Sequence, residues 1–104
     1  MTPTLHIDFE TRSAVDLKKA GAYVYAEDPS TDVWCAAYCV DDGPVQMWLP
    51  GDKTPLIVQE AIDKKWLIVA HNANFERVIW RHVLTPKYGW PEPKLTQWRC
   101  TMAM

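Results

Sequence analysis

The sequence lacks long hydrophobic runs, and it contains few cysteines. No stretch reaches the roughly 18 apolar residues that a membrane-spanning helix needs, and the N-terminus shows no basic-then-apolar signal pattern. The three cysteines are an odd number, which argues against a disulfide framework and favours a reducing cytoplasm. Cys35 and Cys39 have no neighbouring Cys or His that would complete a zinc set, so we interpret them as buried packing residues.

What the chain does contain is typical of one small globular domain. Of its 104 residues, 48% are hydrophobic and 23% are charged, and six are tryptophans. Large aromatic side chains bury much area, so an intrinsically disordered chain is not expected. Neither an internal repeat nor a low-complexity segment is present.

Charge is distributed unevenly along the chain. Residues 1–52 hold three basic and nine acidic side chains, a balance of −6, whereas residues 53–104 hold eight basic and four acidic ones, a balance of +4. An acidic region beside a basic one suits a metal-dependent enzyme that acts on a phosphate polymer, although ordinary surface scatter gives the same balance.

Hydrophobic periodicity predicts a mixed sheet with helices packed on it, an α/β fold. We expect strands at residues 5–10, 33–40, 45–49 and 66–70, with 33–40 covered on both faces and residues 23–25 extended. We expect helices at 13–20, capped by Ser13 and ended by Gly21, at about 55–64 after a Thr54 cap, from Asn74 to about 83, and from Trp98 onward, with a loop at 84–96.

The first candidate site is the pair Asp8 and Glu10. They alternate with apolar residues in the opening strand, so both project from the same face. Carboxylates two residues apart can share a divalent cation, and two adjacent acids are costly to bury without one. Asp-x-Glu alone is common, however, and an exposed strand with two solvated acids explains it equally well.

The second candidate site follows the strand at 66–70, where the sequence reads His71-Asn72-Ala73-Asn74-Phe75-Glu76. Junctions between a strand and a helix are where open α/β sheets place ligand-binding groups. Each residue also has a structural explanation, because Asn72 or Asn74 can cap the helix and Glu76 can interact with its dipole.

Taken together, the two motifs resemble a known superfamily. Asp-Phe-Glu-Thr in an opening strand, followed by Ala-His-Asn-Ala-Asn-Phe-Glu after a later strand, resembles the first two exonuclease motifs of the DnaQ-like (DEDD) superfamily. The segments at residues 16–23 and 28–31 resemble bacteriophage-type family A DNA polymerases, and the resemblance covers essentially the whole chain.

The resemblance implies an RNase H-like fold and two-metal 3′-5′ hydrolysis of terminal nucleotides from the single-stranded 3′ end of DNA, in a bacterial host or phage-infected cell. It assigns Asp8, Glu10 and Glu76 as catalytic ligands of two Mg²⁺ or Mn²⁺ ions. It places Thr11, Asn72 and Phe75 near the terminal nucleotide, where Phe75 is equally well explained as core. The second-motif acid is usually aspartate in the superfamily, and here it is Glu76.

The third motif of that superfamily is absent, because the last aspartate of the chain is Asp63. We therefore expect residues 1–104 to form a C-terminally truncated part of an exonuclease domain, with impaired activity and with the polymerase domain supplied by a longer protein. Two alternatives remain open. One is a DEDD ribonuclease, which differs in its contacts to the 2′-OH. The other is a non-catalytic module that binds nucleic acid or a partner protein on the same fold.

Overall fold

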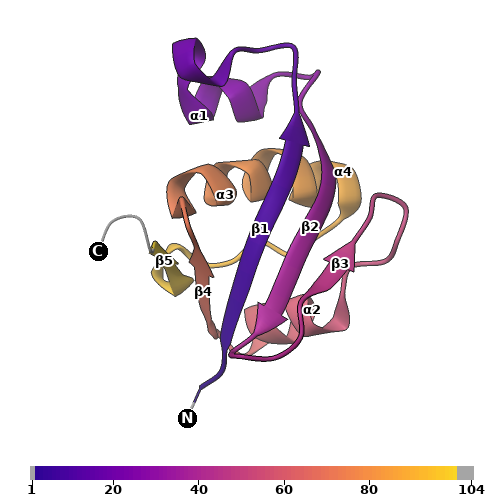
Figure 1. Ribbon diagram of the computed structural model, residues 1–104, viewed down its shortest axis with the longest axis vertical. Coiled ribbons are helices and arrows are strands. Elements are labelled where there is room, and N and C mark those ends of the chain that lie inside the picture. The colour runs from indigo at the N-terminus through magenta and orange to yellow at the C-terminus, as the bar shows by residue number, and fades with distance from the viewer. Residues whose placement is uncertain (1, 101–104) are drawn as a thin grey trace.

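A computed structural model of the chain describes residues 2–100 as a small α/β domain with a mixed sheet (Figure 1). The strands are β1 (Thr4–Arg12), β2 (Asp32–Val40), β3 (Gln46–Trp48), β4 (Leu67–Ala70) and β5 (Trp98–Cys100). The helical segments are α1 (Leu17–Glu27), α2 (Leu56–Asp63), α3 (Ala73–Ile79), the π-helical η1 (Trp80–Leu84), α4 (Thr85–Tyr88) and the 3₁₀ turn η2 (Leu95–Gln97). The predicted α/β class is confirmed.

The sheet has five strands in the order β3-β2-β1-β4-β5. β2 is antiparallel to both β1 and β3, whereas β4 runs parallel to β1 and to β5. The β2–β3 hairpin turns at Asp41 and Asp42 as the sequence indicates. The pairing of β1 with β4 covers only Thr4 to His6, so the rest of β1 extends beyond β4.

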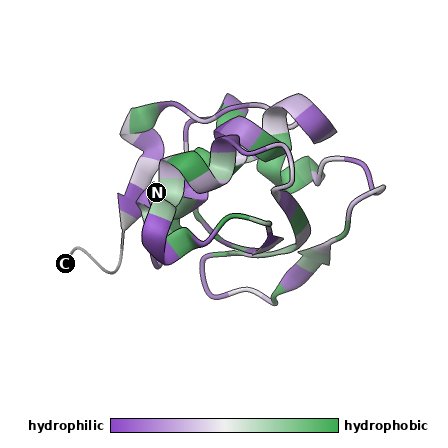
Figure 2. Cartoon of the chain, turned by 90° about the horizontal axis from the view of Figure 1, so that it is seen from above, coloured by the Kyte–Doolittle hydropathy of each residue, from purple (hydrophilic) through white to green (hydrophobic). Residues whose placement is uncertain are grey.

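Within residues 2–100, α2, α3, η1 and α4 lie behind one face of the sheet, and no helix covers the other face of β1 and β2 (Figure 1). Hydrophilic and hydrophobic residues alternate along the elements, as Figure 2 shows from above. The expectation that β2 is covered on both faces is therefore wrong. Its apolar residues include small ones that pack from one side only, and Cys35, Ala37 and Cys39 are only half-buried on the open side.

The helix near the N-terminus differs from its prediction because a different residue caps it. The Asp16 carboxylate accepts hydrogen bonds from the backbone N–H groups of Lys18 and Lys19, so α1 begins at Leu17. Ser13 instead accepts the Val15 N–H in a local turn. Gly21 has a φ of 84°, and the chain kinks there but resumes helical structure to Glu27, which makes residues 23–25 helical rather than extended.

α2 confirms the predicted helix but corrects its start. Pro55 occupies the N-cap position without a side-chain cap, so Thr54 does not cap the helix. Val58 and Ala61 are the buried residues of α2, whereas Leu56 is 88% exposed.

The helix from Ala73 runs further than expected, through α3, η1 and α4 to Tyr88. Part of the predicted loop at 84–96 is therefore helical. Pro86 does not end the helix because it falls in the first turn of α4, where its missing N–H needs no partner. Gly89, with a φ of 73°, ends the helix in the left-handed conformation.

The C-terminal prediction is wrong within the described residues. Trp98–Cys100 form a strand parallel to β4, because Trp98 packs into the core beside Ile68. The remainder of the predicted helix, residues 101–104, lies outside the described residues. None of the helices in residues 2–100 has the length and apolar character required to span a bilayer.

Tryptophans dominate the core between the sheet and the helices. Trp48, Trp80 and Trp90 are each at most 2% exposed. Trp90 meets both of the others edge to face, with ring centroids 5.1 and 5.2 Å apart. Phe9 of β1 joins this cluster at 5.9 Å from Trp80, so the strand that carries the candidate acids is fixed by aromatic packing.

Candidate functional site

The candidate acids lie where β1 extends past the end of β4. Asp8 and Glu10 are exposed on the open face, as predicted, and Phe9 between them is only 4% exposed on the helix face. Past His6, the edge of β1 has no strand partner on the β4 side. The N-terminal turn of α3 lies at this gap, since α3 begins three residues after β4 ends.

Glu76 fills the gap and joins the two sequence motifs. Its Oε2 accepts a hydrogen bond from the backbone N–H of Phe9 at 3.1 Å, and the side chain is only 4% exposed. The N–H of Phe9 would otherwise be an unpaired donor beside the core. The bond places the second-motif carboxyl group next to the strand segment between Asp8 and Glu10.

Burial dominates the electrostatics of Glu76. It raises the pKa of the carboxyl group to about 8, the Phe9 hydrogen bond opposes the rise, and the nearby charges of Asp8 and Glu10 add to it. At neutral pH the group is therefore largely protonated. Burial and two neighbouring carboxylates disfavour the ionised form of this acid. A bound cation would therefore be stabilising at this place.

The three acids do not form a closed metal cage. Within residues 2–100, no group of three or more His, Cys, Asp and Glu side chains is close enough to hold a metal ion. One Glu76 oxygen is directed to the Phe9 N–H, and so it does not face the other two acids. Three carboxylates nevertheless supply the hard oxygen donors that Mg²⁺ and Mn²⁺ prefer.

A second cluster lies at the end of β1 beside α1. The hydroxyl groups of Thr11 and Tyr25 are 2.9 Å apart, and the Tyr25 ring lies 5.9 Å from the Phe75 ring at 45°. A bulge follows Glu10, where β2 inserts Trp34 as an extra residue opposite β1. The structure thus brings together the predicted residues Thr11 and Phe75, and it adds Tyr25.

Sequence reasoning missed Tyr25 because it assigned residues 23–25 an extended conformation. A signal was available in the sequence. Asp16 followed by good helix formers marks the start of a helix, and such a helix can continue past a single glycine. Asn72 is the N-cap of α3, with its Oδ1 accepting the Phe75 N–H at 3.3 Å. The predicted nucleotide contact of Asn72 remains a prediction.

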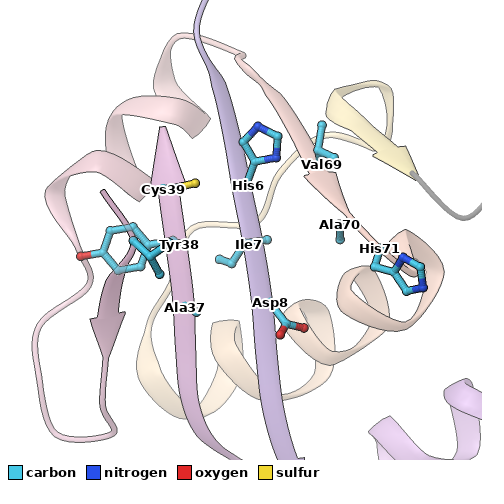
Figure 3. A pocket seen from close by; sticks show the side chains of 10 residues that line it. His6, Ile7, Asp8, Ala37, Tyr38, Cys39, Val69, Ala70 and His71 are labelled. Atoms are coloured by element: carbon cyan, nitrogen blue, oxygen red, sulfur yellow. The ribbon is translucent and has the colours of Figure 1, made fainter. Parts of the chain in front are cut away.

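A groove of about 320 Å³ runs along the open face of the sheet beside Asp8. Figure 3 shows Asp8 at one end of it, with His6 further along β1 and His71 after β4. Small and apolar side chains of Ala37, Cys39 and Val69 contribute much of the lining.

Comparison with known proteins shows a close relationship to a phage DNA polymerase. The DNA polymerase of Bacillus phage SP02 is 43% identical over 105 residues, which cover 94% of this chain and 15% of that protein. The chain is homologous to part of a phage DNA polymerase. The chain spans only 15% of the length of that polymerase. The activity of the whole polymerase therefore cannot be assigned to this chain from the similarity alone.

Two further comparisons complete the picture. No protein-family model matches the chain. Among solved structures, the family B DNA polymerase from the hyperthermophilic archaeon Pyrobaculum calidifontis matches with a TM-score of 0.45 and 17% identity, over 79% of this chain and 11% of that one.

Proposed function

We propose that the chain is the N-terminal part of a DNA polymerase proofreading domain, an RNase H-like 3′-5′ exonuclease that removes terminal nucleotides from DNA. The observation that carries the proposal is the bond from the Phe9 N–H to the Glu76 carboxyl group. It joins the strand of the first motif to the helix of the second, and homology to a phage DNA polymerase supports the same assignment.

Asp8, Glu10 and Glu76 are the residues that would hold divalent cations. Asp8 and Glu10 are exposed and accessible to ions, whereas Glu76 has to lose its proton as a cation binds. Two such ions would supply an acidified water and neutralise charge on the attacking and leaving oxygens. The protein contributes the rigid β1 backbone, which fixes the positions of the first two acids through the packing of Phe9.

The terminal nucleotide is proposed to lie on the α1 side of the acids. Phe75 is half-buried and offers a ring for stacking, a contact worth roughly 1–3 kcal/mol. The Tyr25 hydroxyl group holds Thr11, whose side chain follows the acids on β1. The open-face groove is a less suitable place for the nucleotide because its lining is mainly apolar.

Manganese binding tests the proposal most directly. Titration of Mn²⁺ into the chain at about pH 8, where Glu76 is half ionised, should show saturable changes in chemical shifts or fluorescence, and Asp8→Ala should lose them. Asp42→Ala removes another exposed acid, in the β2–β3 turn, and should bind as the parent chain does. If Asp8→Ala and Asp42→Ala behave alike, the acids do not form a metal site, and the non-catalytic binding module becomes the better explanation.

The isolated chain should have little or no nuclease activity. A two-metal site that lacks one ligand binds its ions weakly and misplaces the attacking water, which commonly lowers activity by orders of magnitude. The assay is release of nucleotides from a labelled single-stranded oligonucleotide with magnesium, compared with a reaction in chelator. Metal-dependent degradation at ordinary enzymatic rates by a clean preparation would contradict this expectation.

A further inference from the structure

A pocket separate from the acids lies on the flank of the long helix that carries Arg77 and Arg81. It has a volume of about 120 Å³ and lies between α3, η1 and the segment that leads into β5. The lining residues are Arg77, Arg81, Glu92, Pro93, Leu95 and Trp98. It contains two arginines but only one acid, so its walls carry a net positive charge.

The two arginines have unused hydrogen-bonding capacity. The ion pairs found within residues 2–100 join Arg12 to Asp32 and Lys64 to Glu60, and neither pocket arginine takes part in one. Arg77 donates from Nη2 to the neutral Asn74 Oδ1 at 3.1 Å. Like charges four residues apart on a helix repel each other, so an anion between Arg77 and Arg81 would relieve a cost already present.

The apolar walls of the pocket reduce the solvent screening of the arginine charges. Trp98 is only 8% exposed and Pro93 is buried, so apolar surface adjoins the guanidinium groups on one side. Charges beside a low-dielectric wall are less screened than charges surrounded by water. The small volume suits a compact anionic group rather than a base.

Two other cations in the second half of the chain already have partners in the fold. Lys87 donates from Nζ to the Thr31 carbonyl at 2.8 Å. Arg99 donates to the carbonyls of Thr96 and Trp98 at 3.0 and 2.7 Å. In the pocket at Arg77 and Arg81, by contrast, two guanidinium groups lie together, and neither forms an ion pair with a residue in 2–100.

We propose that Arg77 and Arg81 bind a backbone phosphate of a single-stranded nucleic acid whose 3′ end lies at Asp8, Glu10 and Glu76. Successive residues of an α-helix point about 100° apart, so α3 presents Glu76 to β1 and Arg77 to the adjacent flank. A strand that leaves the acids can follow that flank. The direction of the nucleic-acid strand rests on the proposed exonuclease function, whereas the phosphate site at Arg77 and Arg81 does not depend on that function.

Glu92 lines the same pocket and opposes an anion there. Its carboxylate reduces the positive potential of the arginines, so its removal should strengthen phosphate binding. This gives a variant that gains binding, which loss of folding cannot imitate. It also distinguishes this pocket from a merely solvated basic surface.

The test measures binding of a labelled single-stranded oligonucleotide of about eight nucleotides in chelator, across a range of salt concentrations. Each lost phosphate contact should reduce the magnitude of the slope of log K against log salt by roughly 0.7. We expect Arg77→Gln and Arg81→Gln to lower both affinity and slope, Glu92→Gln to raise affinity, and the exposed Lys53→Gln to change neither. An acidic peptide of equal charge and inorganic phosphate serve as competitors.

Three outcomes would overturn the inference. They are no measurable binding at low salt, slopes unchanged in both arginine variants, and stronger competition by the acidic peptide than by an unlabelled oligonucleotide. Because the assay contains no metal, its result is independent of the manganese titration. Loss of manganese binding in Asp8→Ala with unaffected arginine variants would leave the exonuclease proposal standing and remove only this site.

Discussion

Replacement of Glu76 by glutamine should abolish most of the pH dependence of folding stability between about pH 5 and about pH 8. The pKa of Glu76 is raised from 4.5 to about 8 in the folded chain, so the folded state binds a proton that the unfolded state releases. The stabilisation from this proton is fully present below about pH 4.5. It is lost as the pH rises toward about pH 8, by an amount on the order of a few kcal/mol.

The measurement is urea unfolding at a series of pH values in chelator, for the parent chain, Glu76→Gln and Glu27→Gln. The parent chain and Glu27→Gln, whose replaced side chain is exposed on α1, should both lose stability as the pH rises. Glu76→Gln should show a nearly flat profile because the neutral amide can no longer release a proton. A parent chain that is equally stable at about pH 5 and about pH 8 would show that Glu76 ionises normally.

The first strand could be predicted well because its pattern has a period of two, whereas β5 was expected to be a helix. Leu5, Ile7 and Phe9 alternate with polar residues in β1, and only a strand places such residues on one face. The strict pattern also fixed which face Asp8 and Glu10 occupy. The β2 prediction failed in one respect, since a run of apolar and small residues does not reveal whether the second face is covered.

The helices were less predictable because single residues decide where they begin and end. Gly21 was expected to end a helix, yet the chain accommodates its positive φ as a kink and continues. Pro86 was expected to lie in a loop, yet the wider π-turn before it restarts the helix so that its ring is tolerated. Such outcomes depend on tertiary packing, in this case of Tyr25 and Leu84, which local propensity does not contain.

Only part of the candidate site was accessible from the sequence. Spacing showed that Asp8 and Glu10 share a face, but nothing in the spacing places Glu76 beside them, since 67 positions separate Phe9 from Glu76. Resemblance to a family supplied that expectation. The hydrogen bond from the Phe9 N–H to Glu76 forms because β1 extends past the end of β4. It therefore depends on the different lengths of the two strands, which sequence patterns define poorly.

Replacement of Trp80 by alanine should cost the chain much of its stability. Trp80 is fully buried and meets the rings of Phe9, Trp90 and Trp98 at 5.9, 5.2 and 5.6 Å. Truncation of a buried tryptophan costs roughly 3–5 kcal/mol, and a domain of this size has only about 5–15 kcal/mol in total. We expect the thermal midpoint to fall by roughly 15 °C or more, with Phe9 and the acids on β1 losing their support.

Trp34→Ala is the matched control, because the Trp34 side chain is 62% exposed at the β2 bulge. It should change the free energy of unfolding by no more than about 0.5 kcal/mol. Circular dichroism during urea unfolding measures both variants without relying on tryptophan emission. Similar losses in the two variants would show that Trp80 does not hold the core together.

A pair of phenylalanine variants separates packing from hydrogen bonding in the same cluster. The Trp80 Nε1 donates to the Pro91 carbonyl at 2.7 Å, whereas the buried Trp90 Nε1 has no partner within the described residues. Trp80→Phe and Trp90→Phe remove similar volume. Only Trp80→Phe leaves a carbonyl without its donor, at a cost of about 1–3 kcal/mol. Trp80→Phe should therefore be the more destabilising of the two. The difference bears on function, since Trp80 follows directly on α3, the helix that carries Glu76 and Arg77.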